Sequence, residues 1–274
     1  MKEKLKWLWR ITKENFGNKA DNSINIEFDK TKDLRVMTFN IRRDRLSDGA
    51  NNWQFRRDAI IKMIADQKPD IICMQEVMPH MAKFLKAKLS KYYDCKGLES
   101  FTGKEVTKSF CVLGEGLLTM YRKDRFKLCD KEAIKLFDGR KINLRRAFVT
   151  YLRDEFSERY RAIVNTHFCH KSEEAREKSF DKIWDWHREY GIYYRTFICG
   201  DFNCSGSKPH IWSRFFKNPQ SEQGTINFFN GASKKTIDFI LSNVPFCKTE
   251  VIRKEYGGVK FLSDHWPVMN TYTL

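Results

Sequence analysis

The chain contains 274 residues, of which 51 are Lys or Arg and 35 are Asp or Glu, so its formal net charge is +16. Hydrophobic residues make up 41% and aromatic residues 14% of the chain, proportions that exclude an intrinsically disordered protein. The length suits a large domain with a buried core, and the basic charge favours a polyanionic partner, either nucleic acid or an anionic membrane surface.

Residues 1–30 form a polar leader in which Leu5, Leu8 and Ile11 recur at helical spacing between basic side chains. This pattern predicts a short, basic amphipathic helix. We expect the helix to pack on the rest of the protein; the alternative is that residues 1–16 lie on a membrane surface or on nucleic acid. The leader lacks the long apolar stretch and the cleavage site of a secretory signal peptide.

Eight cysteines occur, and none forms a Cys-x-x-Cys pair, which argues against a zinc ribbon or a thioredoxin-like motif. Since no signal peptide is recognisable, we expect a reduced, cytoplasmic protein. No run of about 18 apolar residues is present, so the sequence predicts no transmembrane helix.

From residue 34 onward, apolar alternation and short apolar runs predict strands at 34–39, 70–75, 117–121, 147–152, 161–166, 195–199, 236–241 and 266–272. Helical spacing of apolar residues predicts helices over 53–67, 79–89 and 173–190. Pro69 follows the first helix, Pro79 opens the second and Ser172 caps the third. Residues 204–233 have the composition of a long loop. Because no linker separates these elements, we predict a single α/β domain over residues 31–274.

Polar side chains lie where several of these strands begin or end. They are Asn40, Glu76, His167, Asp201, Asn203, Asp238, Asp264 and His265. Because packed sheets bring the ends of their strands together at one rim, we expect these side chains to converge.

The residue types at this rim are chemically coherent. Asn40, Glu76 and Asp264 offer the oxygen ligands that Mg²⁺ prefers, with Mn²⁺ as a substitute. His167 and His265 can transfer protons near neutral pH or donate hydrogen bonds to phosphate oxygens.

The remaining acidic and amide groups complete the set. Asp238 stands in an otherwise apolar strand, where a buried charge is costly, so we expect it to orient a neighbouring histidine. Asp201 and Asn203 are two residues apart, and a sharp turn would aim both at one phosphate. Carboxylates and histidines without an activated Ser or Cys indicate attack by water rather than by a side-chain nucleophile.

Six segments, taken in order, carry a family resemblance. They are Met37-Thr38-Phe39-Asn40, Gln75-Glu76-Val77, Asn165-Thr166-His167, Gly200-Asp201-Phe202-Asn203, Ile237-Asp238-Phe239-Ile240 and Ser263-Asp264-His265-Trp266-Pro267. Together they resemble the endonuclease/exonuclease/phosphatase superfamily, which has the pancreatic-deoxyribonuclease-like fold. The resemblance implies a four-layer α/β/β/α sandwich of two packed mixed β-sheets flanked by helices.

The resemblance also implies roles for the residues of the metal and phosphate sites. Glu76, with Asn40 nearby, would bind the divalent metal, and Asp264 would add a further carboxylate. His265 would contact the scissile phosphate, paired with Asp238.

The remaining residues of the motifs are implied to act on water and phosphate. Asp201 would orient or deprotonate the attacking water, Asn203 would hold a phosphate oxygen and His167 would be a second histidine facing the phosphate.

A further segment, residues 114–126, is similar to a generic, mostly bacterial branch of the superfamily. Within or near it, Glu115, Tyr121 and Arg146 are candidate substrate contacts, as is Arg42 in the basic loop after the first strand. The alternative for Glu115, Tyr121 and Arg146 is a purely structural role.

We therefore expect a Mg²⁺-dependent phosphodiesterase that acts on nucleic acid. Basic residues at 42–45, 83–91 and 234–235 would follow the phosphates, and Trp212, Phe215 and Phe216 would either stack on bases or lie in the core. The second hypothesis is a phosphatase or a phospholipid phosphodiesterase of the sphingomyelinase type that uses the same site. The third is a non-catalytic binding module.

Overall fold

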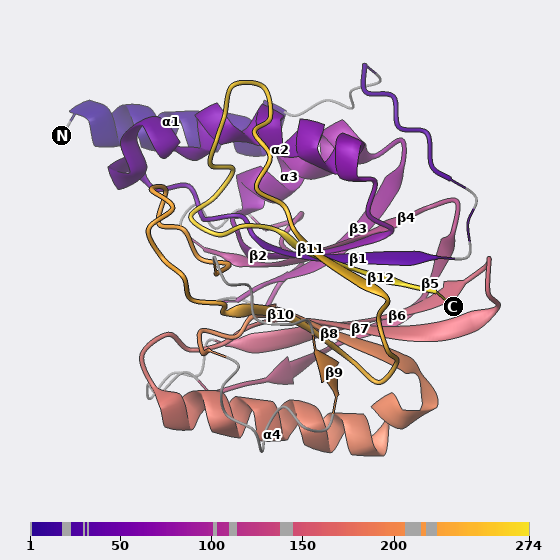
Figure 1. Ribbon diagram of the computed structural model, residues 1–274. Coiled ribbons are helices and arrows are strands. Elements are labelled where there is room, and N and C mark those ends of the chain that lie inside the picture. Colours follow the sequence, from indigo (N-terminus) through magenta and orange to yellow (C-terminus); the bar gives the residue numbers. More distant parts are fainter. Residues whose placement is uncertain are drawn as a thin grey trace.

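The computed structural model describes residues 2–17, 23–29, 31, 33–100, 103–109, 114–137, 145–205, 215–217 and 224–273. Two six-stranded sheets pack face to face, and helices cover both outer faces (Figure 1). The helices α1, α2 and α3 lie over one sheet and α4 lies over the other. This arrangement confirms the predicted four-layer α/β/β/α sandwich.

The first sheet has the order β11-β12-β1-β2-β4-β3. Its strands are β11 (Lys248–Val251), β12 (Val268–Tyr272), β1 (Leu34–Asn40), β2 (Ile71–Val77), β4 (Gly116–Arg122) and β3 (Tyr93–Glu99). Only β1 and β2 are parallel neighbours, and their register pairs Asn40 with Gln75. Asn40 and Glu76 therefore end adjacent strands at the same edge of this sheet.

The second sheet has the order β5-β6-β7-β8-β10-β9. Its strands are β5 (Phe126–Lys135), β6 (Arg146–Asp154), β7 (Arg159–His167), β8 (Arg195–Asp201), β10 (Asp238–Ser242) and β9 (Phe216–Lys217). The parallel pair β7–β8 sets His167 opposite Asp201, and the antiparallel pair β8–β10 sets Asp238 opposite Asp201. Three predicted site residues thus lie abreast on neighbouring strands.

The helices are α1 (Lys2–Gly17), α2 (Trp53–Gln67), α3 (Pro79–Leu89) and α4 (Glu173–Glu189), with short 3₁₀ turns η1 (Leu46–Asn51) and η2 (Gly191–Tyr193). The predicted starts of the three internal helices are confirmed. Asn52 caps α2 by accepting from the Gln54 amide, and Ser172 caps α4 by accepting from the Ala175 amide. None of the helices described is both long enough and apolar enough to cross a membrane.

Three apolar layers hold the sandwich together. One lies between the first sheet and α2 and α3, one between the two sheets and one between the second sheet and α4. A buried amide pair also joins the sheets: Gln75 donates to Asn165 over 2.9 Å, and Asn165 donates to the Met74 and Leu118 carbonyls over 3.1 Å. This pair lies directly behind the strand ends that carry Asn40 and Glu76.

The sequence pattern did not indicate the edge strands β3, β5 and β11. Most side chains of β5 are solvent-exposed and those of β11 are exposed or half-buried, and an edge strand needs no alternation of apolar residues to pair with its neighbour. The structure also starts β10 at Asp238 and not at residue 236, so Asp238 opens the strand instead of lying inside it.

The predicted aromatic loop has a mixed outcome. Phe215 packs in the core beneath α4, whereas Phe216 is exposed in β9. Trp212 lies outside the described residues.

Candidate active site

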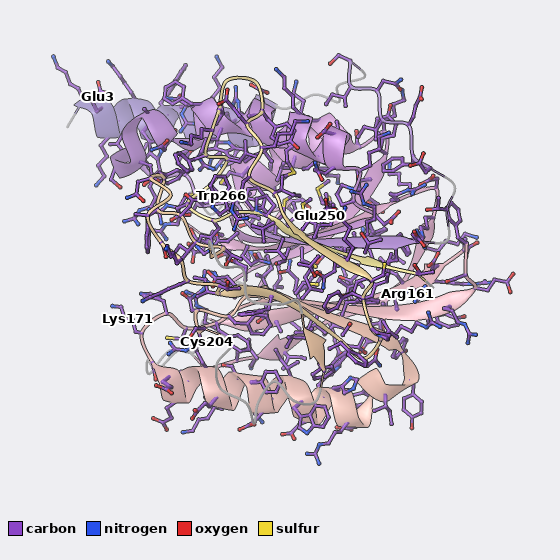
Figure 2. All side chains as sticks on the ribbon, viewed as in Figure 1. Glu3, Arg161, Lys171, Cys204, Glu250 and Trp266 are labelled. Carbon is purple, nitrogen blue, oxygen red and sulfur yellow. The ribbon has the colours of Figure 1, made fainter. Side chains whose placement is uncertain are left out.

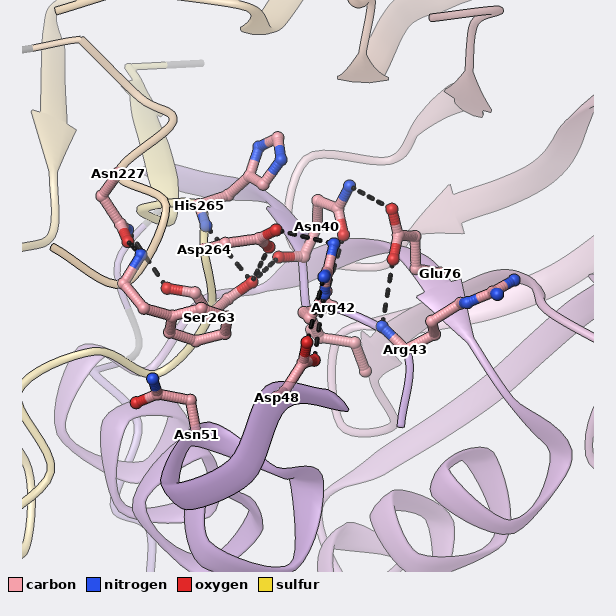
Figure 3. A network of polar contacts seen from close by, with 12 residues as sticks. Asn40, Arg42, Arg43, Asp48, Asn51, Glu76, Asn227, Ser263, Asp264 and His265 are labelled. Atoms are coloured by element: carbon pink, nitrogen blue, oxygen red, sulfur yellow. Dashed lines mark hydrogen bonds and ion pairs between the residues drawn. The ribbon is translucent and has the colours of Figure 1, made fainter. Parts of the chain in front are cut away.

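The Asn40 side chain makes polar contacts with both sheets. Its side-chain amide donates to Glu76 Oε1 over 3.3 Å on the neighbouring strand (Figure 3) and to Asp201 Oδ2 over 3.1 Å on the opposite sheet. Its own oxygen accepts from the Arg42 backbone amide over 3.1 Å. In this arrangement Asn40 orients Glu76 and Asp201, and its oxygen is already engaged.

Glu76 is turned into the site by an irregular backbone. The β2–β4 register shifts between Met74 and Val77, and Glu76 has φ of 60°, a left-handed conformation that costs a non-glycine residue free energy and that clusters at functional sites. The Arg43 backbone amide donates to Glu76 Oε2 over 3.1 Å. Burial opposes ionisation, but His167, this amide and Arg42 outweigh it and lower the pKa of Glu76 to about 2.

Asp264 approaches the same region from the loop before β12. Arg42 Nη1 lies 2.9 Å from Asp264 Oδ2, and Ser263 Oγ donates to Asp264 Oδ1 over 3.2 Å (Figure 3). Ser263 Oγ also donates to the Asn40 carbonyl over 2.6 Å, which ties this loop to the end of β1.

Arg42 is engaged by two carboxylates at the site. Its guanidinium donates to both carboxylate oxygens of Asp48 over 3.1 Å as well as pairing with Asp264. In this arrangement Arg42 positions Asp264 and η1, and its contact with a substrate stays a prediction.

The oxygens gathered here fit a divalent cation. Burial and the charge of Glu76 both raise the pKa of Glu115, and burial is the main cause of the raised pKa of Asp264, to which Glu76 also contributes. Glu76 therefore influences both of the other carboxyl groups, and a cation beside it would relieve this repulsion. Glu76 and Asp264 are the carboxylates that would hold a divalent cation, which needs few protein ligands when it keeps several waters.

A second cluster lies on the opposite sheet. His265 Nδ1 is 2.9 Å from Asp238 Oδ2 and 3.1 Å from Oδ1, and its Nε2 is 3.8 Å from Asp201 Oδ2. His167 Nε2 reaches the same Asp201 oxygen from the other side at 3.4 Å. The ligand atoms of Asp201, Asp238 and His265 lie within 4.8 Å of one another, which is also compact enough for a metal ion.

The pKa values of the two histidines in this cluster are shifted in opposite directions. Burial lowers the pKa of His265, but Asp238 and Asp201 more than compensate and raise it to about 10. Burial and then Arg145 hold the pKa of His167 well below its ordinary value. Near neutral pH, His265 is a cation with two N–H donors and His167 is neutral.

Asp201 has the environment of a proton acceptor. Burial is the main reason that its pKa rises to about 7, and the nearby charge of Asp238 adds to the shift against the opposing effect of His265. Asn203, in a left-handed conformation with φ of 51°, donates from its backbone to Asp201 Oδ1 over 2.9 Å. The Asn203 side chain donates to the Phe168 carbonyl over 3.1 Å, so a role in holding phosphate stays a prediction.

Several supporting residues carried no clear signal in the sequence. Thr225 donates to Asp238 Oδ2 over 2.6 Å and accepts from the amides of Ile237 and Asp238, which fixes the carboxylate that faces His265. Thr225 lies in the polar loop predicted at 204–233, where no periodic pattern marks a position as buried.

Arg56 is a second residue of this kind. Its buried guanidinium donates to the carbonyls of Asn51, Ile41, Arg42 and Leu262 and thereby joins the loop after β1 to the segment that precedes Asp264. Its spacing from Trp53 and Ile60 on the apolar face of α2 was the signal that could have indicated burial.

Two of the predicted substrate contacts, Glu115 and Arg146, lie near the site residues. Glu115 pairs with Arg43 at 3.0 Å and with Arg145 at 4.0 Å beside Glu76. Arg146 opens β6 at the sheet edge that also carries His167, where its Nε is 3.5 Å from the Ser100 carbonyl.

Tyr121 does not join them, and its predicted role is corrected. It pairs in register with Ile71 at the opposite end of β2, it is buried between the sheets and its hydroxyl donates to Asp94 over 3.3 Å. The Tyr121 hydroxyl therefore forms a hydrogen bond within the sandwich, away from the site residues.

A family model described as the Endonuclease/Exonuclease/phosphatase family matches residues 37–265, which run from the first motif described above to His265 in the last. The chain belongs to this family. It is therefore a phosphoesterase, and the family's reaction is consistent with a buried cluster of acids and histidines. A comparison with curated proteins finds no match.

Several solved structures superpose on most of this chain. An endonuclease/exonuclease/phosphatase from Bacteroides vulgatus is 28% identical, with a TM-score of 0.74 over 87% of this chain and 98% of that one. The mannosyl-6-phosphatase of Bacteroides thetaiotaomicron is 24% identical, with a TM-score of 0.73 over 86% and 98% of the two chains. TDP2 from D. rerio, complexed with single-strand DNA product, is 16% identical, with a TM-score of 0.66 over 87% and 98%. The last two share the fold with this phosphoesterase.

Proposed function

We propose that this phosphoesterase is a Mg²⁺-dependent enzyme that hydrolyses phosphodiester bonds in nucleic acid by attack of water on phosphorus. The observation that carries the proposal is the position of Asp201, which lies 3.4 Å from the neutral His167 and 3.8 Å from the charged His265. A proton acceptor flanked by two imidazoles suits the activation of water beside a phosphate.

The described residues divide the chemical work. Asp201 accepts a proton from the attacking water, and His265, held by Asp238, donates a hydrogen bond to a developing charge on a phosphate oxygen. When bound by Glu76 and Asp264, the cation supplies positive charge that stabilises the transition state. The hydroxyls of Thr225 and Ser263 donate to Asp238 and to the Asn40 carbonyl, so we infer that water is the nucleophile.

Charge and an exposed aromatic side chain support nucleic acid as the substrate. The net charge is +16, and Lys171, Lys234 and Lys235 are exposed next to segments that carry site residues. Phe228 is 57% exposed and has φ of 53°, and its backbone amide donates to the Asp264 carbonyl over 3.1 Å. An exposed aromatic ring held in a strained conformation beside the site suits stacking on a base.

A second candidate is a phosphatase that acts on a small phosphate monoester. The pair Arg43 and Arg145, both facing Glu115 beside Glu76, would accommodate the extra charge of a monoester. The B. thetaiotaomicron mannosyl-6-phosphatase, which shares the fold, is the comparison that favours this candidate.

The two candidates are separated by a substrate panel of single-stranded and duplex oligonucleotides and sugar phosphates, each assayed with Mg²⁺ and with EDTA. We expect cleavage of oligonucleotides that EDTA abolishes, that Asp201→Asn reduces by on the order of 10²-fold or more, and that the exposed control Asp58→Asn leaves unchanged. Turnover of sugar phosphates without cleavage of any nucleic acid would replace the first candidate with the second.

A further inference from the structure

The helix α1 has one face docked on the protein. Trp7 Nε1 and Arg10 Nη2 donate to the two oxygens of Asp44 over 3.0 and 2.6 Å, and Ile11 is fully buried. Further along, Arg57 pairs with Glu14 at 2.8 Å. The position of α1 is therefore defined by specific contacts, and so is the face that it turns to solvent.

That outer face is apolar. Leu5, Trp9 and Phe16 are 59%, 67% and 73% exposed, and their spacing of four and seven residues places them along one side of the helix. The Phe16 ring also faces Lys83 of α3, whose Nζ lies 5.9 Å from the centre of the ring. Most of this apolar stripe is nevertheless in contact with water, which is unfavourable unless the stripe is covered.

Basic side chains accompany the stripe. Lys2, Lys6 and Lys13 are exposed on the same side of α1, and Lys13 Nζ lies 5.1 Å from the centre of the Trp9 ring. The one acidic residue among them, Glu3, is paired with Lys6 at 3.2 Å. Lys beside Trp, Leu and Phe is the composition of helices that lie in the interface of an anionic membrane.

We propose that α1 docks this protein on an anionic lipid surface through Leu5, Trp9 and Phe16, with Lys2, Lys6 and Lys13 contacting the headgroups. This inference goes beyond the hydrolysis of phosphoesters and does not depend on which substrate is cleaved. A nucleic acid would pair with the lysines but leave the apolar stripe uncovered, and a second copy of the basic helix would repel the first. A membrane surface satisfies both the apolar and the basic groups.

The docked helix would lie near the active site. Asp44 accepts hydrogen bonds from Trp7 and Arg10 of α1. It directly follows Arg43, and the Arg43 backbone amide donates to the Glu76 carboxylate. Figure 1 shows α1 on the outer face of the first sheet, and Figure 2 labels Glu3 at the same end of the molecule as Lys171 and Cys204, close to the ends of β7 and β8.

The experiment is flotation of the purified full chain with phosphatidylcholine vesicles, with or without phosphatidylglycerol. We expect flotation with the anionic vesicles only, and a decrease of about tenfold or more in the bound fraction for Trp9→Ser/Phe16→Ser. Lys2→Glu/Lys6→Glu/Lys13→Glu should abolish the preference for anionic lipid. Ile192→Ser/Tyr193→Ser, which removes exposed apolar side chains elsewhere, is the matched control and should float like the wild type.

Circular dichroism and hydrolysis of a soluble phosphoester, both unchanged, would show that the α1 variants remain folded. Failure of the wild-type protein to float would overturn the proposal, as would equal flotation of the Trp9→Ser/Phe16→Ser variant. A dimer in lipid-free buffer that this variant dissociates would instead assign the stripe to a second copy of the chain.

Discussion

Asn40 and Asp201 are 161 positions apart in the sequence, and the Asn40 side-chain amide donates to Asp201 Oδ2 over 3.1 Å. The same amide nitrogen donates to Glu76 Oε1 over 3.3 Å. Asn40 thus links the carboxylate that would hold the metal ion to the carboxylate that would accept the proton. The two halves of the site lie on different sheets, and this amide holds them in register.

Removal of this link should affect both metal affinity and turnover. We expect Asn40→Ala to weaken Mn²⁺ binding by roughly 10–100-fold, because residues that orient a metal ligand typically contribute that much. The rate at saturating metal should also fall, since Asp201 loses a hydrogen bond. Metal titration followed by steady-state kinetics measures both effects, and the exposed Asn230→Ala serves as control. Wild-type values in both assays would show that Asn40 is only structural.

Asp238 and His265 should behave as a unit. We expect His265→Ala and Asp238→Asn each to reduce the rate by on the order of 10²-fold, because Asp238 keeps the imidazole charged and oriented. The double variant should be about as slow as His265→Ala alone, since Asp238 acts through the histidine. A double-mutant cycle at saturating Mg²⁺ measures this, and additive losses would mean that Asp238 has a role of its own.

Glu76 should dominate the affinity for the divalent cation. Glu76→Gln replaces a carboxylate whose pKa is lowered to about 2 with a neutral amide of similar size. We expect Mn²⁺ binding, followed by electron paramagnetic resonance, to weaken by at least about tenfold while the fold is retained. Glu174→Gln, at an exposed position of α4, should bind the ion like the wild type. Unchanged affinity for Glu76→Gln would move the metal site elsewhere, for instance to the cluster of Asp201, Asp238 and His265.

Stability should decrease in acid through a buried ion network remote from the site. Burial opposes ionisation of Asp154, but hydrogen bonds from the buried Arg125 and Arg161 outweigh it and lower its pKa. The folded protein therefore holds the deprotonated form more strongly than the unfolded chain does. The network contributes its full stability above the ordinary carboxyl pKa of about 4 and loses it as the pH falls further.

The variant Asp154→Asn tests this account. It removes the carboxylate that pairs with the buried Arg161 and one of the two carboxylates that pair with Arg125, which also lies 3.3 Å from Asp70. We expect it to lower the free energy of unfolding near neutral pH by about 3–5 kcal/mol. Its stability should also vary less with pH below about pH 4 than that of the wild type. Urea unfolding across a pH series measures both. A steeper acid dependence in Asp154→Asn than in the wild type would contradict the sign of the shift.

The sequence alone determined the fold class and the internal helices, and it indicated most of the residues that the structure brings together at one rim. Apolar periodicity is a local property, so the central strands and α2, α3 and α4 could be recognised from short windows. Strands that end in Asn40, Glu76, His167 and Asp201 indicated a shared rim before any pairing was known.

Only the tertiary structure decided what each of these residues contacts. That Asp238 lies opposite Asp201 and that Tyr121 lies at the far end of β2 follow from strand register, whereas the ion pairs of Arg42 with Asp48 and Asp264 follow from the packing of loops. Strand register joins residues that are distant in the sequence and leaves no periodic trace in either segment. For the same reason Thr225 and Arg56 became visible as supports of the site only once the two sheets were packed together.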